Sequence, residues 1–363
     1  MRDTDQGSLP DQADGGTPAE RIAQVGVLVT TGRSAEAVAL AEPLLGELDA
    51  EGSRQQRLQV LSWLGPAYVD LHRLDESLTV TSELIELAGD EPSTELASAL
   101  CLRGVMLVKL RRENQGLADL RRATTLTEPG LLDDEGLFNA LAVLASSSAN
   151  IGLYEASERY CVWGEALAAH ASPPALAYQA ESWAWLHAEW AVTLWQEGDD
   201  EGARRHVERL RELTADVRRA AEELAPPEEL GRDVVSVDAA TLRALVAAWD
   251  GRADDALRIL DGLEVRPSTR LGHSPALAAA MARAVAHRVR GDVDATIRHA
   301  REVADLASAA GGERWEAEAY RILRDVTPDR GLAGAANERF EALFDGLAWQ
   351  RRLRPLQLAP RDG

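Results

Sequence analysis

The sequence predicts an all-α fold, a solenoid of stacked antiparallel helix pairs, and three observations predict it. Ala, Leu, Glu and Arg are abundant while aromatic residues make up only 5% of the 363 residues, a composition that favours helices over strands. A short turn signature recurs along the chain, and most successive copies lie about 40 residues apart, a period typical of solenoids. Hydrophobic residues make up 45%, enough for a large core, yet no apolar run approaches the roughly 20 residues of a membrane span.

The signature marks the junction between two helices. It consists of a glycine or polar residue, then acidic residues, then a small residue. The clear copies are Gly32–Ala37, His72–Ser77, Gly152–Ser157, Gly198–Ala203, Gly251–Ala256 and Gly291–Thr296, and a weaker copy is Arg111–Gly116. We expect the glycine to end one helix in a left-handed conformation and the acidic residue to lie in the first turn of the next. The small residue lets the two helices cross closely, and neighbouring pairs must stack to bury their apolar faces.

Several units carry a set of residues at matching positions. They are Leu64, Gly65, Tyr68, Ser77 and Leu84 in the second unit, Leu144, Ala145, Gly152 and Ser157 in the fourth, and Trp190, Ala191, Leu194, Gly198 and Ala203 in the fifth. These residues resemble the tetratricopeptide repeat (TPR) over roughly residues 18–310. The resemblance implies a right-handed superhelix of about seven to eight helical hairpins, with a final pair running to about residue 354. Two arginines, Arg103 and Arg243, occupy sites that the family normally fills with apolar residues. Long repeats of this kind are similar to the arrays of actinobacterial signalling regulators.

The chain divides into four predicted segments. Residues 1–16 form a disordered acidic N-terminus, and residues 17–225 form an N-terminal sub-array. Residues 226–354 form a second sub-array with C-terminal capping helices, and residues 355–363 form a flexible tail. The boundary falls at Pro226–Pro227, which we interpret as a long inter-helix loop or as a soft boundary between two sub-arrays.

The formal net charge of −21 argues against nucleic acid as the main partner. The best candidate for a local basic patch is the group Arg351, Arg352 and Arg354. The N-terminus has no apolar stretch typical of a signal peptide, so we expect a cytoplasmic protein that does not bind membranes.

The densest unusual feature is the four-tryptophan segment from Tyr178 to Trp195. At helical spacing one side carries Trp183, Leu186, Trp190 and Leu194 and fits packing against the following helix. The other side carries the candidate partner-binding residues Trp185, Val192, Trp195, Gln196, Glu181 and Glu189, which the resemblance places in the concave groove of the array. Two interpretations stay open: the tryptophans fill gaps between irregular repeats, or they anchor a bound partner.

No residue pattern predicts catalysis, a cofactor or a metal site. His187 falls beside Trp190 on the packing side, which is typical of a core histidine, and Cys101 and Cys161 sit in apolar helical patterns as free thiols. The segment Gly311–Trp315 is similar to the signature of diguanylate cyclases, but it lies at a turn between two helices without the strand context that such a site needs.

The sequence therefore predicts a non-catalytic scaffold that binds a protein or a peptide, with acidic groups selecting basic partners. Two alternatives stay open: an enzyme of an unrecognised type, and a sensory or regulatory module of a transcriptional regulator or diguanylate cyclase that lacks its output domain. The Arg-rich amphipathic segment Phe340–Leu358 fits either a capping helix or a stalk toward such a domain.

Overall fold

The computed structural model describes residues 16–30, 33–51, 54–71, 73–110, 112–171, 173–223, 231–263, 275–310 and 312–353, and all regular structure within them is helical. The N-terminal half of the array contains α1 (Pro18–Thr30), α2 (Ser34–Glu51), α3 (Arg54–Asp70), α4 (Leu74–Ala88), α5 (Thr94–Lys109), α6 (Glu113–Thr125), α7 (Asp134–Asn150), α8 (Tyr154–Ala166) and the short 3₁₀ turn η1 (Ala168–His170). The C-terminal half contains α9 (Pro173–Glu197), α10 (Asp200–Glu223), α11 (Gly231–Trp249), α12 (Ala253–Asp261), α13 (Pro275–Arg290), α14 (Val293–Ala310), α15 (Glu313–Val326) and α16 (Arg330–Leu353).

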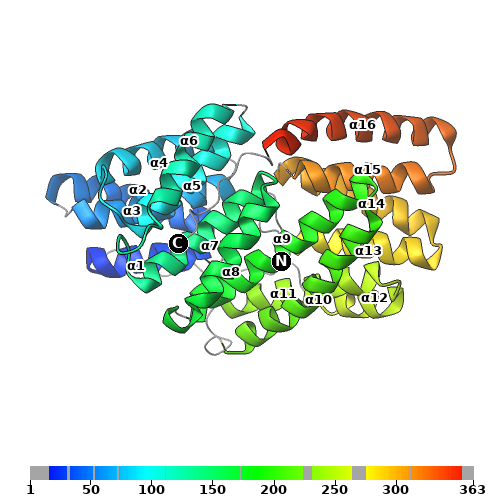
Figure 1. Cartoon of the computed structure of the whole chain (residues 1–363), viewed down its shortest axis with the longest axis horizontal. Coiled ribbons are helices and arrows are strands. Elements are labelled where there is room, and N and C mark those ends of the chain that lie inside the picture. Colours follow the sequence, from blue (N-terminus) through cyan, green and yellow to red (C-terminus); the bar gives the residue numbers. More distant parts are fainter. Residues whose placement is uncertain are drawn as a thin grey trace, which may run out of the picture.

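The sixteen helices of the described residues form eight pairs, each odd-numbered helix packing against the even-numbered helix that follows it. Successive pairs lie side by side, from the blue pair α1–α2 through the green helices at the centre to the red α16 (Figure 1). The chain is therefore a helical solenoid, and the expected seven to eight hairpins are confirmed.

The turn signature acts as the sequence predicts. Gly152, Gly198, Gly251 and Gly291 all have positive φ, between 76° and 82°. The residue after each glycine donates its N–H to a carbonyl five residues earlier, as Asp199 does to Leu194 at 2.9 Å, which satisfies a helix C-terminus. The first copy contains Gly32, and the second contains His72, both of which lie outside the described residues.

The small residue of each signature lies at a helix crossing. Ser77 donates its hydroxyl to the Gly65 carbonyl at 2.8 Å, and Ser157 donates to the Ala145 carbonyl at 2.7 Å. In the third pair the same place holds Gly116, where an added Cβ would lie 2.5 Å from the Gly104 carbonyl oxygen. The small side chains thus let the two helices cross closely, within reach of a hydrogen bond from a serine hydroxyl to the facing main chain.

The two arginines that depart from the repeat pattern have different structural settings. Arg103 on α5 forms a two-pronged ion pair with Asp119 on α6, at 2.7 and 2.8 Å, so its charge is satisfied at a half-buried site. Arg243 on α11 is exposed. Neither arginine therefore leaves an unpaired charge in the core.

Some sequence predictions concern residues outside the described ranges. They include residues 1–15, the linker at Pro226–Pro227, Arg354 and the tail 355–363, so the predicted domain division stays a prediction. On either side of the linker, α10 packs against α11. No helix of the described residues is long and apolar enough to cross a membrane.

The last helix begins earlier than the predicted segment Phe340–Leu358, because α16 starts at Arg330. It packs along α15, with Phe340 and Leu347 buried in a cluster that includes Ala317. In its described part it therefore forms the final member of the array, as a capping helix does.

Candidate partner-binding surface

The candidate surface is built on α9, a helix of 25 residues near the middle of the array. It begins at Pro173, where proline's fixed φ suits a first helical position and its missing N–H is no loss. It ends at Glu197, and the following Gly198 has a φ of +82°. The tryptophan-rich segment thus forms one uninterrupted helix with two distinct sides.

One side of α9 packs against α10, as the sequence predicts. The indole of Trp190 stacks on the ring of His206, with centroids 4.0 Å apart, and Tyr154 of α8 stacks at 5.4 Å from Trp190. Trp183 lies beneath the guanidinium of Arg209 at 4.9 Å. This side is a structural seam of stacked rings.

A stacked histidine pair extends this seam. The Nδ1 atoms of His187 and His206 lie 2.7 Å apart, so one imidazole must donate the shared proton to the other. Burial lowers the pKa of both rings; the charge that His206 would carry lowers the pKa of His187 further, and the charge of Arg205 lowers that of His206. The prediction that His187 is a core histidine is confirmed, because this residue is 1% exposed.

The other side of α9 carries five of the candidate residues at steps of four, four, three and four residues, so that they share one face of the helix. We call this set the acidic–aromatic side of α9: Glu181, Trp185, Glu189, Val192 and Gln196. All except Gln196 are buried, and Gln196 is half-buried. The sixth candidate, Trp195, lies beside this set and contacts Trp249 of α11 edge-on, with ring centroids 4.9 Å apart.

The first turn of α15 contacts the acidic–aromatic side of α9 at Trp185, Glu189 and Gln196. The guanidinium of Arg314 lies 3.1 Å from one carboxylate oxygen of Glu189, and the indole N–H of Trp315 donates to the other at 3.3 Å. Gln196 donates its amide N–H to the Arg314 carbonyl at 2.8 Å, and Trp185 meets Trp315 edge-on at 6.3 Å. The α15 end that approaches the central green helices appears in orange in Figure 1. This face therefore already holds a polypeptide segment.

Sequence reasoning did not identify Arg314 and Trp315 as partners of α9. It singled out the segment 311–315 only for its likeness to a cyclase signature, and the helix α15 that starts at Glu313 confirms its place next to a turn between helices. Nothing in the local pattern connects this segment with Glu189, which lies 125 residues earlier.

Two other kinds of chemistry, metal binding and thiol reactivity, depend on how the His, Cys, Asp and Glu side chains of the described residues are arranged. No group of three or more His, Cys, Asp or Glu side chains there is arranged to hold a metal ion. Cys101 and Cys161 are buried free thiols, as predicted, and burial raises the pKa of Cys101 to about 12.

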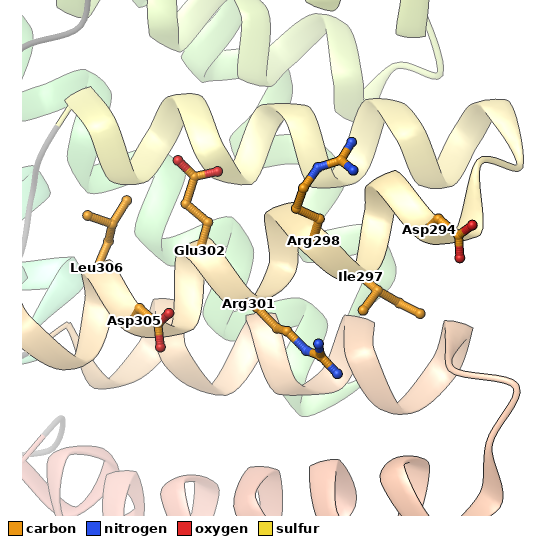
Figure 2. A pocket seen from close by; sticks show the side chains of 7 residues that line it. All are labelled: Asp294, Ile297, Arg298, Arg301, Glu302, Asp305 and Leu306. Atoms are coloured by element: carbon orange, nitrogen blue, oxygen red, sulfur yellow. The ribbon is translucent and has the colours of Figure 1, made fainter.

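A shallow groove runs along the outer side of α14, and Figure 2 shows its lining side chains. Within the described part of the chain, α14 alone supplies them: Asp294, Ile297, Arg298, Arg301, Glu302, Asp305 and Leu306. The lining carries charges of both signs, and Arg301 and Glu302 are exposed. This is the arrangement of a solvated helix face, and we do not place the functional site here.

Comparisons with known proteins bear on the fold. No protein-family model matches the sequence, and no curated protein matches it. The solved structure of a Rap protein complexed with competence and sporulation factor is similar, with a TM-score of 0.51 and 11% identity, over 92% of this chain and 99% of that chain. Ton1535 from Thermococcus onnurineus NA1 aligns over 88% of this chain and 99% of that chain, with a TM-score of 0.33 and 13% identity. The all-helical array and the likeness to the Rap protein fit a tetratricopeptide-type repeat fold.

Proposed function

We propose that the chain is a non-catalytic scaffold that binds a peptide or a segment of another protein. One observation carries the proposal: the acidic–aromatic side of α9 binds a polypeptide segment, the first turn of α15. This side of α9 contacts the side chains of Arg314 and Trp315 and the main-chain carbonyl of Arg314. A surface that recognises a backbone oxygen, a cation and an aromatic ring has the chemistry that peptide recognition requires.

The buried carboxylates of this region support a binding role over a catalytic one. Glu189 pairs with Arg314, Glu316 pairs with Arg339, and Glu318 pairs with Arg321. A carboxylate held in an ion pair acts as an acceptor of fixed hydrogen bonds. The arrangement is therefore one of recognition and packing.

The fold neighbour supports the same class of function by analogy. That Rap protein was solved in a complex with competence and sporulation factor. Fold alone does not assign function, so the argument for this chain rests on the α9 surface. The net charge of −21 favours a basic partner, and we place the scaffold in bacterial cytoplasmic signalling or regulation.

The candidate residues for partner binding remain Trp185, Val192, Trp195, Gln196, Glu181 and Glu189. Trp195 and Gln196 are half-buried, so they can be changed with less damage to the core than the four buried members. They are the first positions to test.

The test is a selection of displayed random peptides on the immobilised full-length chain, followed by fluorescence anisotropy with each enriched peptide. We expect the double variant Trp195→Ala, Gln196→Ala to weaken binding at least tenfold. A matched control is Val162→Ala, which removes an apolar side chain that is 54% exposed on α8. Equal affinities for wild type and double variant would remove the α9 surface from the proposal, and enrichment of no peptide would contradict the scaffold function.

A further inference from the structure

The contact between α9 and α15 joins parts of the array that regular stacking keeps apart. In a helical-repeat array each unit contacts only its neighbours. The eighth pair does contact its neighbour, because α15 packs against α14. However, α15 also reaches α9 of the fifth pair, and the Arg314 guanidinium lies 5.3 Å from the ring centroid of Tyr154 in α8. An additional interaction thus holds the C-terminal pair against the middle of the array.

We infer that the first turn of α15 is an intramolecular ligand, which occupies the acidic–aromatic side of α9 until a partner segment with an arginine followed by an aromatic residue replaces it. The inference rests on the proposed function. It adds the chemical class of the ligand and the contact that regulates access to the surface.

The contacts of α15 define what a replacement must carry. Glu189 receives both the guanidinium of Arg314 and the indole N–H of Trp315, one on each carboxylate oxygen. Trp185 supports the Trp315 ring, and Gln196 binds a backbone carbonyl that any peptide possesses. An arginine next to an aromatic residue therefore satisfies every one of these groups.

Charge makes this exchange selective. The side chains of Glu189 and Arg314 are only 5% and 9% exposed, so their ion pair lies away from water. An acidic or purely apolar segment in the place of α15 would not replace the Arg314 guanidinium at the buried Glu189 carboxylate, and loss of one partner of a buried ion pair is strongly unfavourable. When α15 withdraws, the Glu189 carboxylate loses its contact with Arg314, and its negative charge attracts a basic segment.

Tethering explains why the surface is closed in the free chain. A ligand joined to its own binding surface acts at a high effective concentration, so a separate peptide competes at a disadvantage. The apparent affinity of that peptide is reduced by the fraction of molecules in which the surface is open. A change that weakens the α15 contact without touching α9 should therefore strengthen binding of an external peptide.

The experiment measures the affinity of a fluorescein-labelled peptide that copies residues 312–323 for the full-length chain. Arg314→Glu opposes Glu189 with a second negative charge and should release α15, while Arg298→Glu makes the same charge change at an exposed position of α14. We expect at least tenfold tighter binding to Arg314→Glu than to the wild type or to Arg298→Glu. Adding Glu189→Gln to Arg314→Glu should abolish the gain. Circular dichroism and thermal melting establish that each variant is folded.

Hydrogen exchange gives a second measurement that needs no variant. With excess peptide, the first-turn amides of α15 in the wild-type chain should exchange faster, while those of α14 should not change. Unchanged α15 exchange at saturating peptide, or equal affinity of folded Arg314→Glu and wild type, overturns the intramolecular-ligand inference. If peptides from the random selection still bind in that case, the proposed scaffold function stands. If neither the 312–323 peptide nor any selected peptide binds either protein, both proposals fail.

Discussion

The histidine pair between α9 and α10 should make the stability of the fold depend on pH in mildly acidic solution. His187 is 1% exposed, its Nδ1 lies 2.7 Å from that of His206, and the two arginines Arg205 and Arg209 add positive charge nearby. Protonating both rings would place two cations in contact within this seam, and Asp199 would oppose them in part. The folded chain therefore holds the pair neutral, whereas the unfolded chain protonates both rings near pH 6.5.

The sign and size of the effect follow from linkage. Burial lowers the pKa of His206 from 6.5 to about 4. A histidine with a lowered folded pKa contributes stability that is complete above pH 6.5 and is lost as the pH falls toward 4. Each proton taken up only by the unfolded chain lowers the free energy of unfolding by up to ~1.4 kcal/mol per pH unit. The His206 shift alone then sets an upper limit of roughly 3 kcal/mol over this pH range, which solvent screening at the half-buried ring reduces, and His187 acts in the same direction.

The assay is urea unfolding followed by tryptophan fluorescence at pH values from 8 to 5, because Trp190 stacks directly on His206 and reports on the seam. The matched variant is His206→Asn, whose amide retains a polar group near Nδ1 but does not titrate. Between pH 6 and 5 the wild type should lose up to ~1.4 kcal/mol more than the variant. Carboxylate titration is common to both proteins and cancels in the difference. Equal slopes for the two proteins would refute the reasoning.

Three further outcomes follow from packing. Gly116→Ala should destabilise the fold by about 1–3 kcal/mol in urea unfolding, because the new Cβ would lie 2.5 Å from the Gly104 carbonyl oxygen; an unchanged midpoint would contradict this crossing. Gly46→Ala, on an exposed part of α2 with nothing within 4 Å, should raise stability by up to ~1 kcal/mol in the same assay. Cys101 and Cys161 should resist an aromatic disulfide reagent at pH 8 until urea unfolds the chain, because burial raises the pKa of both thiols, and rapid labelling of the folded chain would show that the helices open.

Local chemistry explains why so much of the array could be predicted from the sequence. A glycine such as Gly198 ends a helix because only a left-handed residue closes the last turn cheaply, and that requirement is visible in a few residues. The same holds for Ser77, whose small side chain is dictated by the approach of the Gly65 carbonyl. The side of α9 that packs on α10 was also predictable, because Trp183, Leu186 and Trp190 follow one another at helical spacing.

The contact that closes the acidic–aromatic side of α9 was not predictable in this way. It depends on how far the array turns between the fifth and eighth pairs, and that turn is the sum of small rotations at successive pairs. A rotation at one crossing depends on the volumes of side chains that are interchangeable in a hydrophobic pattern. The sequence thus predicts that Trp185 and Glu189 share a side of α9, but it does not predict that Arg314 completes it.

The two sides of α9 differ in a way that bears on function. The side toward α10 uses stacked rings, which bury apolar area. Separating these rings would expose that area to water, so this contact favours permanent packing. The side toward α15 uses a buried ion pair between Glu189 and Arg314, although well-packed apolar side chains of similar volume are often at least as stable at such sites. An apolar seam would hold α15 as firmly without selecting what replaces it. An ion pair makes release conditional on another cation, so the polar chemistry of this contact is the feature that fits a surface built for exchange.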